Sequence, residues 1–275
     1  MIKITFFGSS KFSVFCLEEL KALGLLPSLV ITTIDKPTGR GLKLTPTPVK
    51  VWAEANKIDC LTPEKLTDKI DGDIFLVASY GKIIPQKILE MPRYGTLNIH
   101  PSLLPKYRGP SPLQEQILNN EKNMGVSLML IDEKMDHGPI IAQAPIVIDE
   151  WPNLEDLKRL TAKIGAKLFA RNLDNWLNKK IEARAQAHDQ ATFTKKVEKI
   201  DGLIDLEMDD QYKSFLKIQA YSLWPQAYFF IVKNDKKFRV IIKDAAFENG
   251  ALIIKRVLPE GKKEMSYDDF LQGLN

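Results

Sequence analysis

The sequence predicts an α/β fold, in which a doubly wound, mostly parallel sheet is followed by a small β domain. Short apolar runs alternate with segments of helical periodicity through the first two-thirds of the chain, as in β-α-β units. The run at 73–79 is almost continuously apolar, which is typical of a strand buried on both faces. From Trp224 onward, apolar runs are separated by Asn-Asp and Asn-Gly turns, which favours antiparallel strands.

The elements of the sheet domain follow from apolar periodicity and from residues that begin or end them. A first strand at 2–7 is closed by Gly8, and Ser9 and Ser10 then offer an N-cap for a helix that ends near Gly24. Further strands are predicted at 28–34, 73–79, 96–100, 126–131 and 140–148, and further helices at 49–56, 111–119 and 154–177.

The pattern changes after Lys180, where the chain becomes polar and irregular. We predict a catalytic domain over 1–184, a linker over 185–208 and a small C-terminal domain over 209–275. Within 211–265 there are 11 Lys and Arg against 5 Asp and Glu, an excess of six positive charges. A basic surface of this kind favours an anionic partner. The predicted strands of this domain are at 227–232, 238–242 and 252–257.

Composition limits the class of protein. A chain of 275 residues with 44% hydrophobic residues is long enough for one large and one smaller domain. No apolar run approaches the length of a membrane span, and the N-terminus lacks the features of a signal peptide. Cys16 and Cys60 have neither metal nor redox spacing, so we expect free thiols in a reducing compartment, the cytoplasm.

The densest cluster of unusual polar residues lies at the predicted strand 96–100. Asn98 and His100 are two residues apart, so their side chains face the same side of a strand, which Pro101 then ends. Asp136 follows 36 residues after His100, in a turn between two apolar strands. Because ligands bind beyond the carboxyl ends of strands in doubly wound sheets, these three residues form a candidate catalytic set.

An amide, an imidazole and a carboxylate suit acyl transfer to nitrogen. A preorganised donor to the oxyanion of the tetrahedral intermediate contributes about 2.7–4 kcal/mol. A carboxylate and an imidazole take the proton of the attacking amine and deliver it to the leaving nitrogen. The alternative stays open at this point, because Asn-X-His pairs on strands are more often structural, and Asp before His-Gly-Pro is ordinary turn chemistry.

Three motifs resemble the signature of folate-dependent formyltransferases: Asn-Ile-His at 98–100, Ser-Leu-Leu-Pro-Lys-Tyr-Arg-Gly at 102–109, and Met-Asp-His-Gly-Pro at 135–139. The resemblance implies a Rossmann-like fold, the formyl donor 10-formyltetrahydrofolate and no metal. It implies that Asn98 holds the formyl oxygen and that His100 stabilises the oxyanion and assists proton delivery. Asp136 would orient or activate His100 and relay the proton of the amine.

Residues 77–85 resemble the segment of that family that wraps the pterin. Extended backbone there offers amide and carbonyl groups to the ring edge, while apolar side chains cover its faces. A buried strand that ends in a loop would have the same sequence features, so this assignment rests on the resemblance. The predicted folate-binding residues are Val77, Tyr80, Ile83, Ile84 and Pro85, with Ser102, Leu103, Leu104 and Pro105.

Members of that family act on methionyl-tRNA, on glycinamide ribonucleotide or on amino sugars, and three features favour tRNA. The segment 35–50, predicted to be a long loop, has four Lys or Arg against one acid and resembles a loop that engages the acceptor stem. The basic C-terminal segment resembles an OB-like domain that contacts tRNA, although it is too short for five strands. Residues 192–196 resemble the linker of those enzymes. The predicted tRNA-binding residues are Lys36, Arg40, Lys43, Lys50, Lys195 and Lys196.

The resemblance therefore implies an enzyme that formylates initiator methionyl-tRNA for translation initiation. We expect a monomer that binds no membrane. One rival is a formyltransferase for a nucleotide-linked amino sugar, which would not need the basic segment around Arg40. A second is a catalytically silent protein that binds RNA or senses folate. A dehydrogenase is disfavoured, because the turn at 8–10 lacks the glycines that bind a pyrophosphate.

Overall fold

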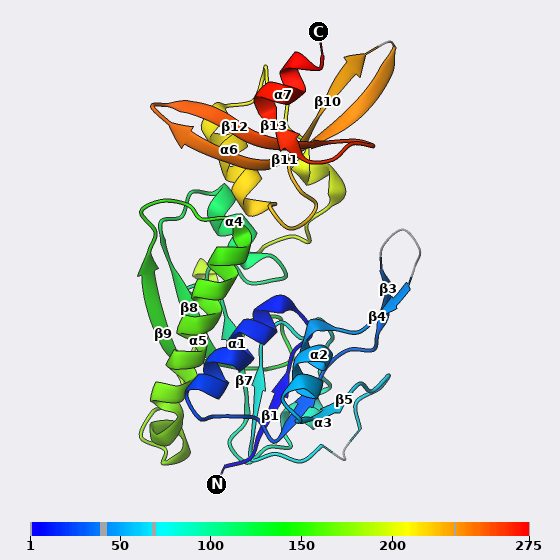
Figure 1. The fold of residues 1–275 in the computed structure, drawn as a ribbon. Coiled ribbons are helices and arrows are strands. Elements are labelled where there is room, and N and C mark those ends of the chain that lie inside the picture. Colours follow the sequence, from blue (N-terminus) through cyan, green and yellow to red (C-terminus); the bar gives the residue numbers. More distant parts are fainter. Residues whose placement is uncertain (1, 39–42, 68–69, 234, 275) are drawn as a thin grey trace. The chain divides into compact units, whose positions relative to one another are not determined.

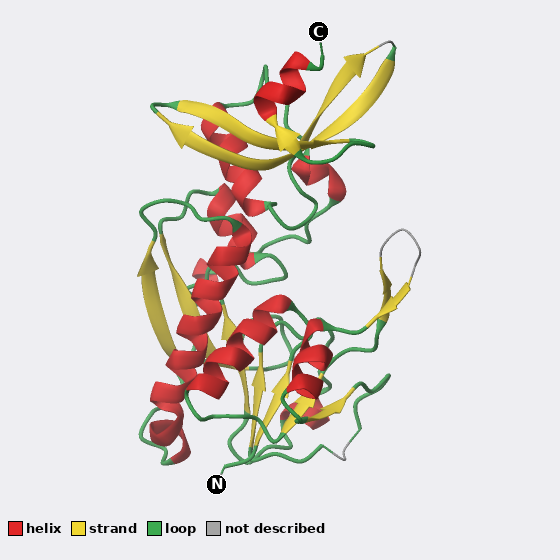
Figure 2. Cartoon of the chain, viewed as in Figure 1, coloured by secondary structure: helices red, strands yellow, loops and turns green. Residues whose placement is uncertain are grey.

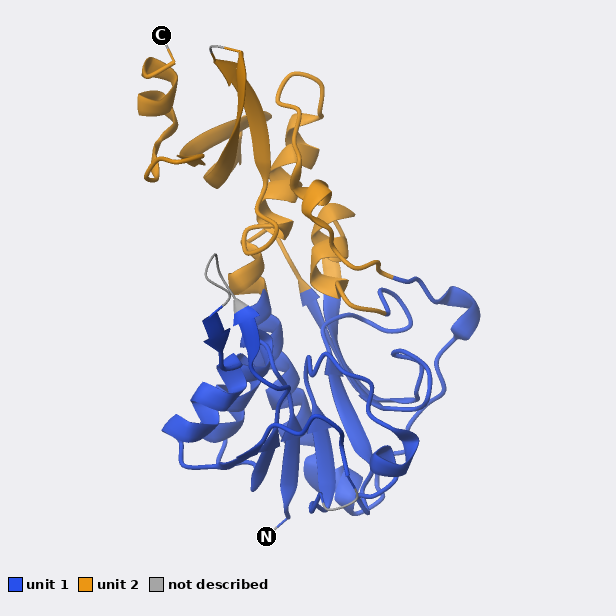
Figure 3. Ribbon diagram, turned by 90° about the vertical axis from the view of Figure 1, so that its right-hand side faces the viewer, with its two compact units in different colours: residues 1–108, 124–146, 158–193 blue, residues 109–123, 147–157, 194–275 orange. Residues whose placement is uncertain are grey.

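The computed structural model describes residues 2–38, 43–67, 70–233 and 235–274, which form two compact units (Figure 3). Unit 1 comprises Met1–Arg108, Met124–Ile146 and Lys158–Phe193, and unit 2 comprises Gly109–Asn123, Val147–Leu157 and Thr194–Asn275. The units are thus interleaved along the sequence. The predicted boundaries at 184 and 208 stay a prediction.

Unit 1 is built on a seven-stranded sheet with the order β5-β2-β1-β6-β7-β8-β9 (Figure 1). The first five strands in this order are parallel, and β8 is antiparallel to β7. The strand order reverses between β1 and β6, so the predicted doubly wound, mostly parallel sheet is confirmed. The strands are β1 (Ile4–Phe7), β2 (Leu29–Ile31), β5 (Asp59–Leu61), β6 (Ile74–Val77), β7 (Thr96–His100), β8 (Asn123–Leu130) and β9 (Ile140–Val147).

Helices α1 (Lys11–Ala22), α2 (Pro48–Ala55), α3 (Gln86–Leu89) and α5 (Leu154–Leu177) accompany these strands (Figure 2). Two of them begin at hydroxyl caps. The Ser10 hydroxyl accepts from the Ser13 amide, as the sequence predicts, and the Thr47 hydroxyl accepts from the Lys50 amide. These caps satisfy backbone donors that the first turn of a helix leaves unpaired.

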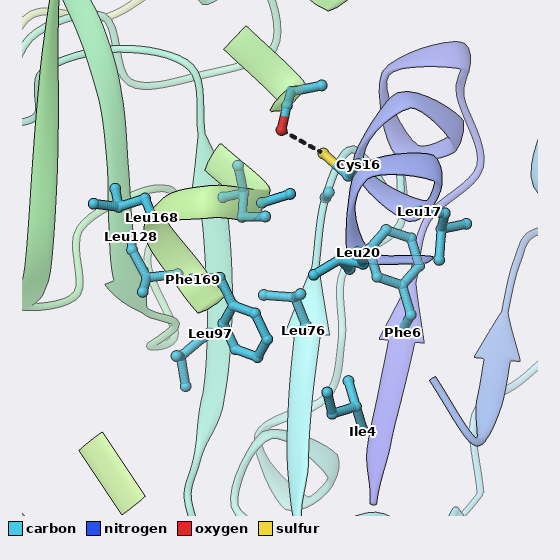
Figure 4. Packing of buried hydrophobic residues seen from close by; sticks show 14 of the residues in the cluster. Ile4, Phe6, Cys16, Leu17, Leu20, Leu76, Leu97, Leu128, Leu168 and Phe169 are labelled. Atoms are coloured by element: carbon cyan, nitrogen blue, oxygen red, sulfur yellow. Dashed lines mark hydrogen bonds between the residues drawn. The ribbon is translucent and has the colours of Figure 1, made fainter. Parts of the chain in front are cut away.

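The parallel strands bury alternate residues in two clusters on opposite faces of the sheet. On one face, Phe6, Leu97 and Ile99 pack with α1, α2 and α5 (Figure 4). On the other face, a second cluster contains Phe7 and Val77. Because side chains alternate along a strand, Asn98 and His100 lie on the face of β7 opposite to Leu97 and Ile99.

The segment predicted as a long loop contains an antiparallel hairpin of β3 (Lys36–Thr38) and β4 (Lys43–Thr45), which stands off the sheet (Figure 1). Alternating polar residues with β-branched threonines favour extended pairing here, which explains the difference from the prediction. Arg40 lies outside the described residues.

Unit 2 combines α4 (Pro112–Leu118), α6 (Gln211–Ala220), a four-stranded antiparallel sheet and α7 (Tyr267–Gln272). Its buried cluster includes Ile218, Phe229 and Val257. A four-stranded sheet agrees with the expectation of too few strands for a five-stranded barrel. The strands are β10 (Tyr228–Lys233), β11 (Lys236–Glu248), β12 (Ala251–Pro259) and β13 (Met265–Ser266). Across the described ranges of both units, every helix is too short or too polar to cross a membrane.

Candidate active site

Two predicted catalytic residues meet at the carboxyl end of β7. His100 is the last residue of that strand, and Asp136 lies in the turn between β8 and β9. His100 Nδ1 is 3.5 Å from Asp136 Oδ1, and the two side chains are 5% and 15% exposed. Asp136 therefore presents more of its surface to a ligand than His100 does.

The other nitrogen of His100 is also engaged. Nε2 lies 3.0 Å from the backbone oxygen of Tyr107. A carbonyl oxygen can only accept, so this contact places a proton on Nε2. Nδ1 is consequently the nitrogen that faces the Asp136 carboxylate.

Asn98 is paired in register with Val77 of β6 and is partly exposed. Its side chain makes no hydrogen bond with another residue in the described part of the chain. The structure thus places the Asn98 amide on the same face of β7 as His100, two residues before the strand ends. The catalytic roles of the three residues stay a prediction.

The predicted folate segment begins at the same edge of the sheet. Tyr80 is 2% exposed, its ring contacts Phe7 edge-on, and burial raises the pKa of its phenol. Its hydroxyl has no hydrogen-bond partner among the described residues. Ile83 is 95% exposed, whereas Ile84 is buried. A buried polar atom without a partner and an exposed apolar side chain three residues later are both features of a ligand-binding segment.

The second predicted folate segment is mostly turned inward. The hydroxyl of buried Ser102 donates to the Lys106 carbonyl over 2.7 Å, and the amide of buried Leu104 donates to the Ser127 hydroxyl over 3.0 Å. Leu103 and Pro105 are partly exposed. Ser102 and Leu104 therefore shape the turn after β7, while Leu103 and Pro105 retain surface for a ligand.

The predicted tRNA-binding lysines have different surroundings. Lys36 and Lys43 are exposed on the β3–β4 hairpin, and Lys196 is exposed in unit 2. Lys50 Nζ bonds Asp35 Oδ2 over 2.8 Å, and this hydrogen bond raises the pKa of Lys50, so the residue has a structural partner. In unit 2, Lys195 Nζ is 3.5 Å from Asp201 Oδ1 but largely exposed.

The structure also reveals a polar network behind Asp136 that sequence reasoning missed. Gln186 Nε2 donates to the backbone oxygens of Asp136 and Gly138 over 2.9 and 2.7 Å. Gln186 Oε1 accepts from Arg108 Nε and Nη2 over 3.2 and 2.7 Å. Arg108 lies within the family motif at 102–109, whereas Gln186 belongs to a polar stretch in which no motif indicates it.

Two histidines extend this network. His137 and His188 stack with ring centroids 4.0 Å apart, and His137 Nδ1 is 2.6 Å from Asp132 Oδ2. His188 Nδ1 is 2.9 Å from Arg108 Nη2, and because a guanidinium only donates, this nitrogen is an acceptor. Desolvation, followed by the positive charges of His137 and Arg108, lowers the pKa of His188.

Comparison with known proteins identifies the family. Residues 2–173 match the model of the family described as formyl transferase. The methionyl-tRNA formyltransferase of Chloroflexus aurantiacus is 40% identical over 237 residues, 83% of this chain and 76% of that protein. That of a Sulfurihydrogenibium species is 32% identical over 99% of this chain and 97% of its own length.

Among solved structures, the fold resembles that of an N-formyltransferase from Helicobacter canadensis in complex with folinic acid and dTDP-3-aminofucose. The TM-score is 0.62 at 23% identity, and the match covers 90% of this chain and 89% of that one. The matched family region contains β7, the turn at Asp136 and the predicted folate segment at 77–85. This chain belongs to the formyl transferase family.

Proposed function

We propose that this chain transfers the formyl group of 10-formyltetrahydrofolate to the α-amine of initiator methionyl-tRNA, and so supports translation initiation. The observation that carries the proposal is the His100–Asp136 pair beside Asn98 at the carboxyl edge of the sheet. The methionyl-tRNA formyltransferases that are 32–40% identical to most of this chain support the choice of acceptor.

In the proposed reaction, the amine nitrogen attacks the formyl carbon, the bond between that carbon and the folate nitrogen breaks, and the amine proton moves to the leaving nitrogen. Asn98 has an unengaged amide that donates to the developing oxyanion. Asp136, the more exposed partner, takes the amine proton. As the bond to the formyl carbon breaks, Asp136 delivers that proton to the leaving nitrogen and becomes a carboxylate again. His100, whose Nε2 proton is donated to the Tyr107 carbonyl, faces Asp136 through Nδ1 and orients it.

The folate supplies the formyl carbon and the leaving nitrogen. Residues at the end of β6 fit such a ligand: Tyr80 offers a buried hydroxyl that lacks a partner among the described residues, and exposed Ile83 offers an apolar surface. Leu103 and Pro105 supply further partly exposed apolar surface. We assign the pterin ring to this segment, with the predicted residues Val77, Ile84 and Pro85 around it.

The acceptor assignment also rests on charge. The β3–β4 hairpin presents Lys36 and Lys43 to solvent, and the segment 211–265 carries six excess positive charges. Phosphate contacts make binding fall steeply with added salt, so KM for methionyl-tRNA should rise with salt while KM for the folate changes little. Arg40→Ala should raise the KM for methionyl-tRNA without changing the KM for the folate.

The test is formyl transfer from 10-formyltetrahydrofolate to charged initiator methionyl-tRNA, with free methionine and an amino-sugar nucleotide in parallel. Asp136→Asn should lower kcat by about 10²–10⁴-fold, because it removes the proton acceptor. Glu133→Gln is the matched control, since it removes an exposed carboxylate from the same turn. Transfer only to the sugar would overturn the acceptor, and full activity of Asp136→Asn would overturn the site.

A further inference from the structure

The segment 184–193, which we call the strap, belongs to unit 1 and joins two turns of the candidate site. At one end, Arg184 and Ile140 exchange two backbone hydrogen bonds of 2.8 Å, just after the turn of Asp136. At the other end, the Arg108 amide donates to the Thr192 carbonyl over 2.9 Å. Part of the predicted linker is therefore fixed to the catalytic unit at both ends.

Gln186 is the strap residue that reaches Asp136. Its side chain is buried, and its Nε2 bridges the carbonyls of Asp136 and Gly138. Asp136 has a φ of +49°, a left-handed conformation that Asp adopts in turns more readily than most residues other than glycine and that surrounding contacts can stabilise. Two hydrogen bonds from a single amide across this turn supply such a contact.

Arg108 determines which end of the Gln186 amide faces Asp136. The guanidinium of buried Arg108 donates from Nε and Nη2, so the partner that it meets must be the oxygen of the amide. The NH₂ group is then directed to the carbonyls of Asp136 and Gly138. The orientation of the amide therefore follows from chemistry and from two independent contacts.

The strap also contacts the residue that orients His100. The Tyr107 amide donates to the Thr192 hydroxyl over 2.8 Å, and the Tyr107 carbonyl receives the proton of His100 Nε2. Tyr107 has a φ of +60°, so it is left-handed, as Asp136 is. The same short segment thus reaches both partners through their neighbouring backbone.

We propose that Gln186, oriented by Arg108, is a positioning residue that fixes Asp136 against His100 and thereby sets the rate of formyl transfer. This inference rests on the proposed function, because it takes Asp136 as the group that accepts the amine proton. Gln186 itself touches no reacting atom in this scheme and acts through the backbone of the turn.

Gln186→Glu tests the inference with almost no change of shape. The carboxylate still accepts from Arg108, but it cannot donate to the two carbonyls and repels them instead. Displacement of Asp136 should lower kcat by about 100-fold. The KM values for folate and methionyl-tRNA should stay within about threefold, since Gln186 is buried and its side-chain bonds end on other residues of the chain.

A double-mutant cycle separates positioning from a general structural effect. In an Asp136→Asn background, Gln186→Glu should lower the residual kcat by less than about threefold, because its effect acts through Asp136. Gln116→Glu is the matched control: Gln116 is also buried, and its Nε2 donates to the Pro112 carbonyl in α4. Its kcat should be that of the wild-type chain.

The outcomes distinguish the two proposals. An inactive wild-type chain would overturn the proposed function. Fully active Asp136→Asn would overturn the catalytic role of Asp136 and the positioning role with it, whereas wild-type kcat in Gln186→Glu beside an impaired Asp136→Asn would overturn only the positioning role. A crystal structure of Gln186→Glu gives a readout apart from activity: the His100–Asp136 distance should exceed the present 3.5 Å, and an unchanged pair would refute the inference. Gln186→Met, which is uncharged, replaces Gln186→Glu if that variant does not fold.

Discussion

Gly165→Ala should destabilise this chain, although alanine is the better helix former. Gly165 lies in α5, where the helix packs against the sheet. A Cβ at this position would overlap the Cγ2 atom of Ile99 in β7 and stand 3.2 Å from Val126 Cγ1 in β8. Both neighbours are buried, Ile99 being 2% exposed and Val126 fully covered, so neither side chain has space to move away.

Two opposing magnitudes decide the sign. Replacing glycine by alanine inside a helix contributes about 0.8–1.0 kcal/mol. Adding a methyl group to a packed core costs about 1–3 kcal/mol, and the overlap with Ile99 places this site in the upper part of that range. The free energy of unfolding should therefore fall by about 1–2 kcal/mol.

Chemical denaturation followed by circular dichroism measures this difference. Lys163→Ala is the control, because it places alanine at an exposed position of the same helix and should change stability by less than about 0.5 kcal/mol. Since Ile99 separates Asn98 from His100, kcat of Gly165→Ala should fall as well. A variant as stable as the wild-type chain, or more stable, would refute the packing argument.

Three further predictions concern the buried hydroxyl, the stacked histidines and the thiols. Tyr80→Phe should stabilise the free chain by about 1 kcal/mol, because the hydroxyl is buried without a partner among the described residues, and should raise the KM for folate; a destabilised variant would contradict this. His188 has a pKa below its usual 6.5, so the stability from its Arg108 contact is present above pH 6.5 and is lost as the pH falls through the lowered pKa. His188→Asn keeps an acceptor and should lose this acid sensitivity, measured by thermal unfolding across the range; His137, Arg108, Asp132 and Lys134 are the charged groups around His188. Burial raises the pKa of both Cys16 and Cys60, but only Cys16 is fully covered, so a thiol reagent should label Cys60 first and reach Cys16 on unfolding.

The elements that the sequence predicts best are those whose pattern is strongest. The strand predicted at 96–100 and the helix predicted at 154–177 match β7 and α5 residue for residue. The two elements have different local signals. Pro101 ends the strand, and the helix has a long apolar face that buries Leu157, Ala166 and Phe169. A buried face and a defined end are properties that the chain carries locally.

Helices and strands that depend on contacts with segments far away in the sequence were not predicted. Helix α6 was missed, since its buried residues, Ser214, Leu216, Ile218 and Ala220, become a recognisable face only where it packs on the sheet of unit 2. Strand β5 is three residues long and exists through its pairing with β2. Such segments have weak local preferences that tertiary contacts override.

The candidate site divides in the same way. Asn98 and His100 could be paired from the period of one strand, and Asp136 from a motif that resembles a family signature. The contacts that hold them involve Arg108 and Gln186, 78 residues apart, and no local pattern relates those positions. The residues that support a site can therefore be identified only from the structure.

A neutral amide stands between Arg108 and the turn of Asp136. An amide can accept from a guanidinium through its oxygen and donate to a backbone carbonyl through its nitrogen. Arg108 forms no ion pair with a carboxylate of the described residues, and its donors end on Gln186 and His188. Arg108 orients the Gln186 amide, and the NH₂ group of that amide donates to the backbone carbonyl of Asp136. The turn is thus held by a buried arginine that acts through the backbone of Asp136.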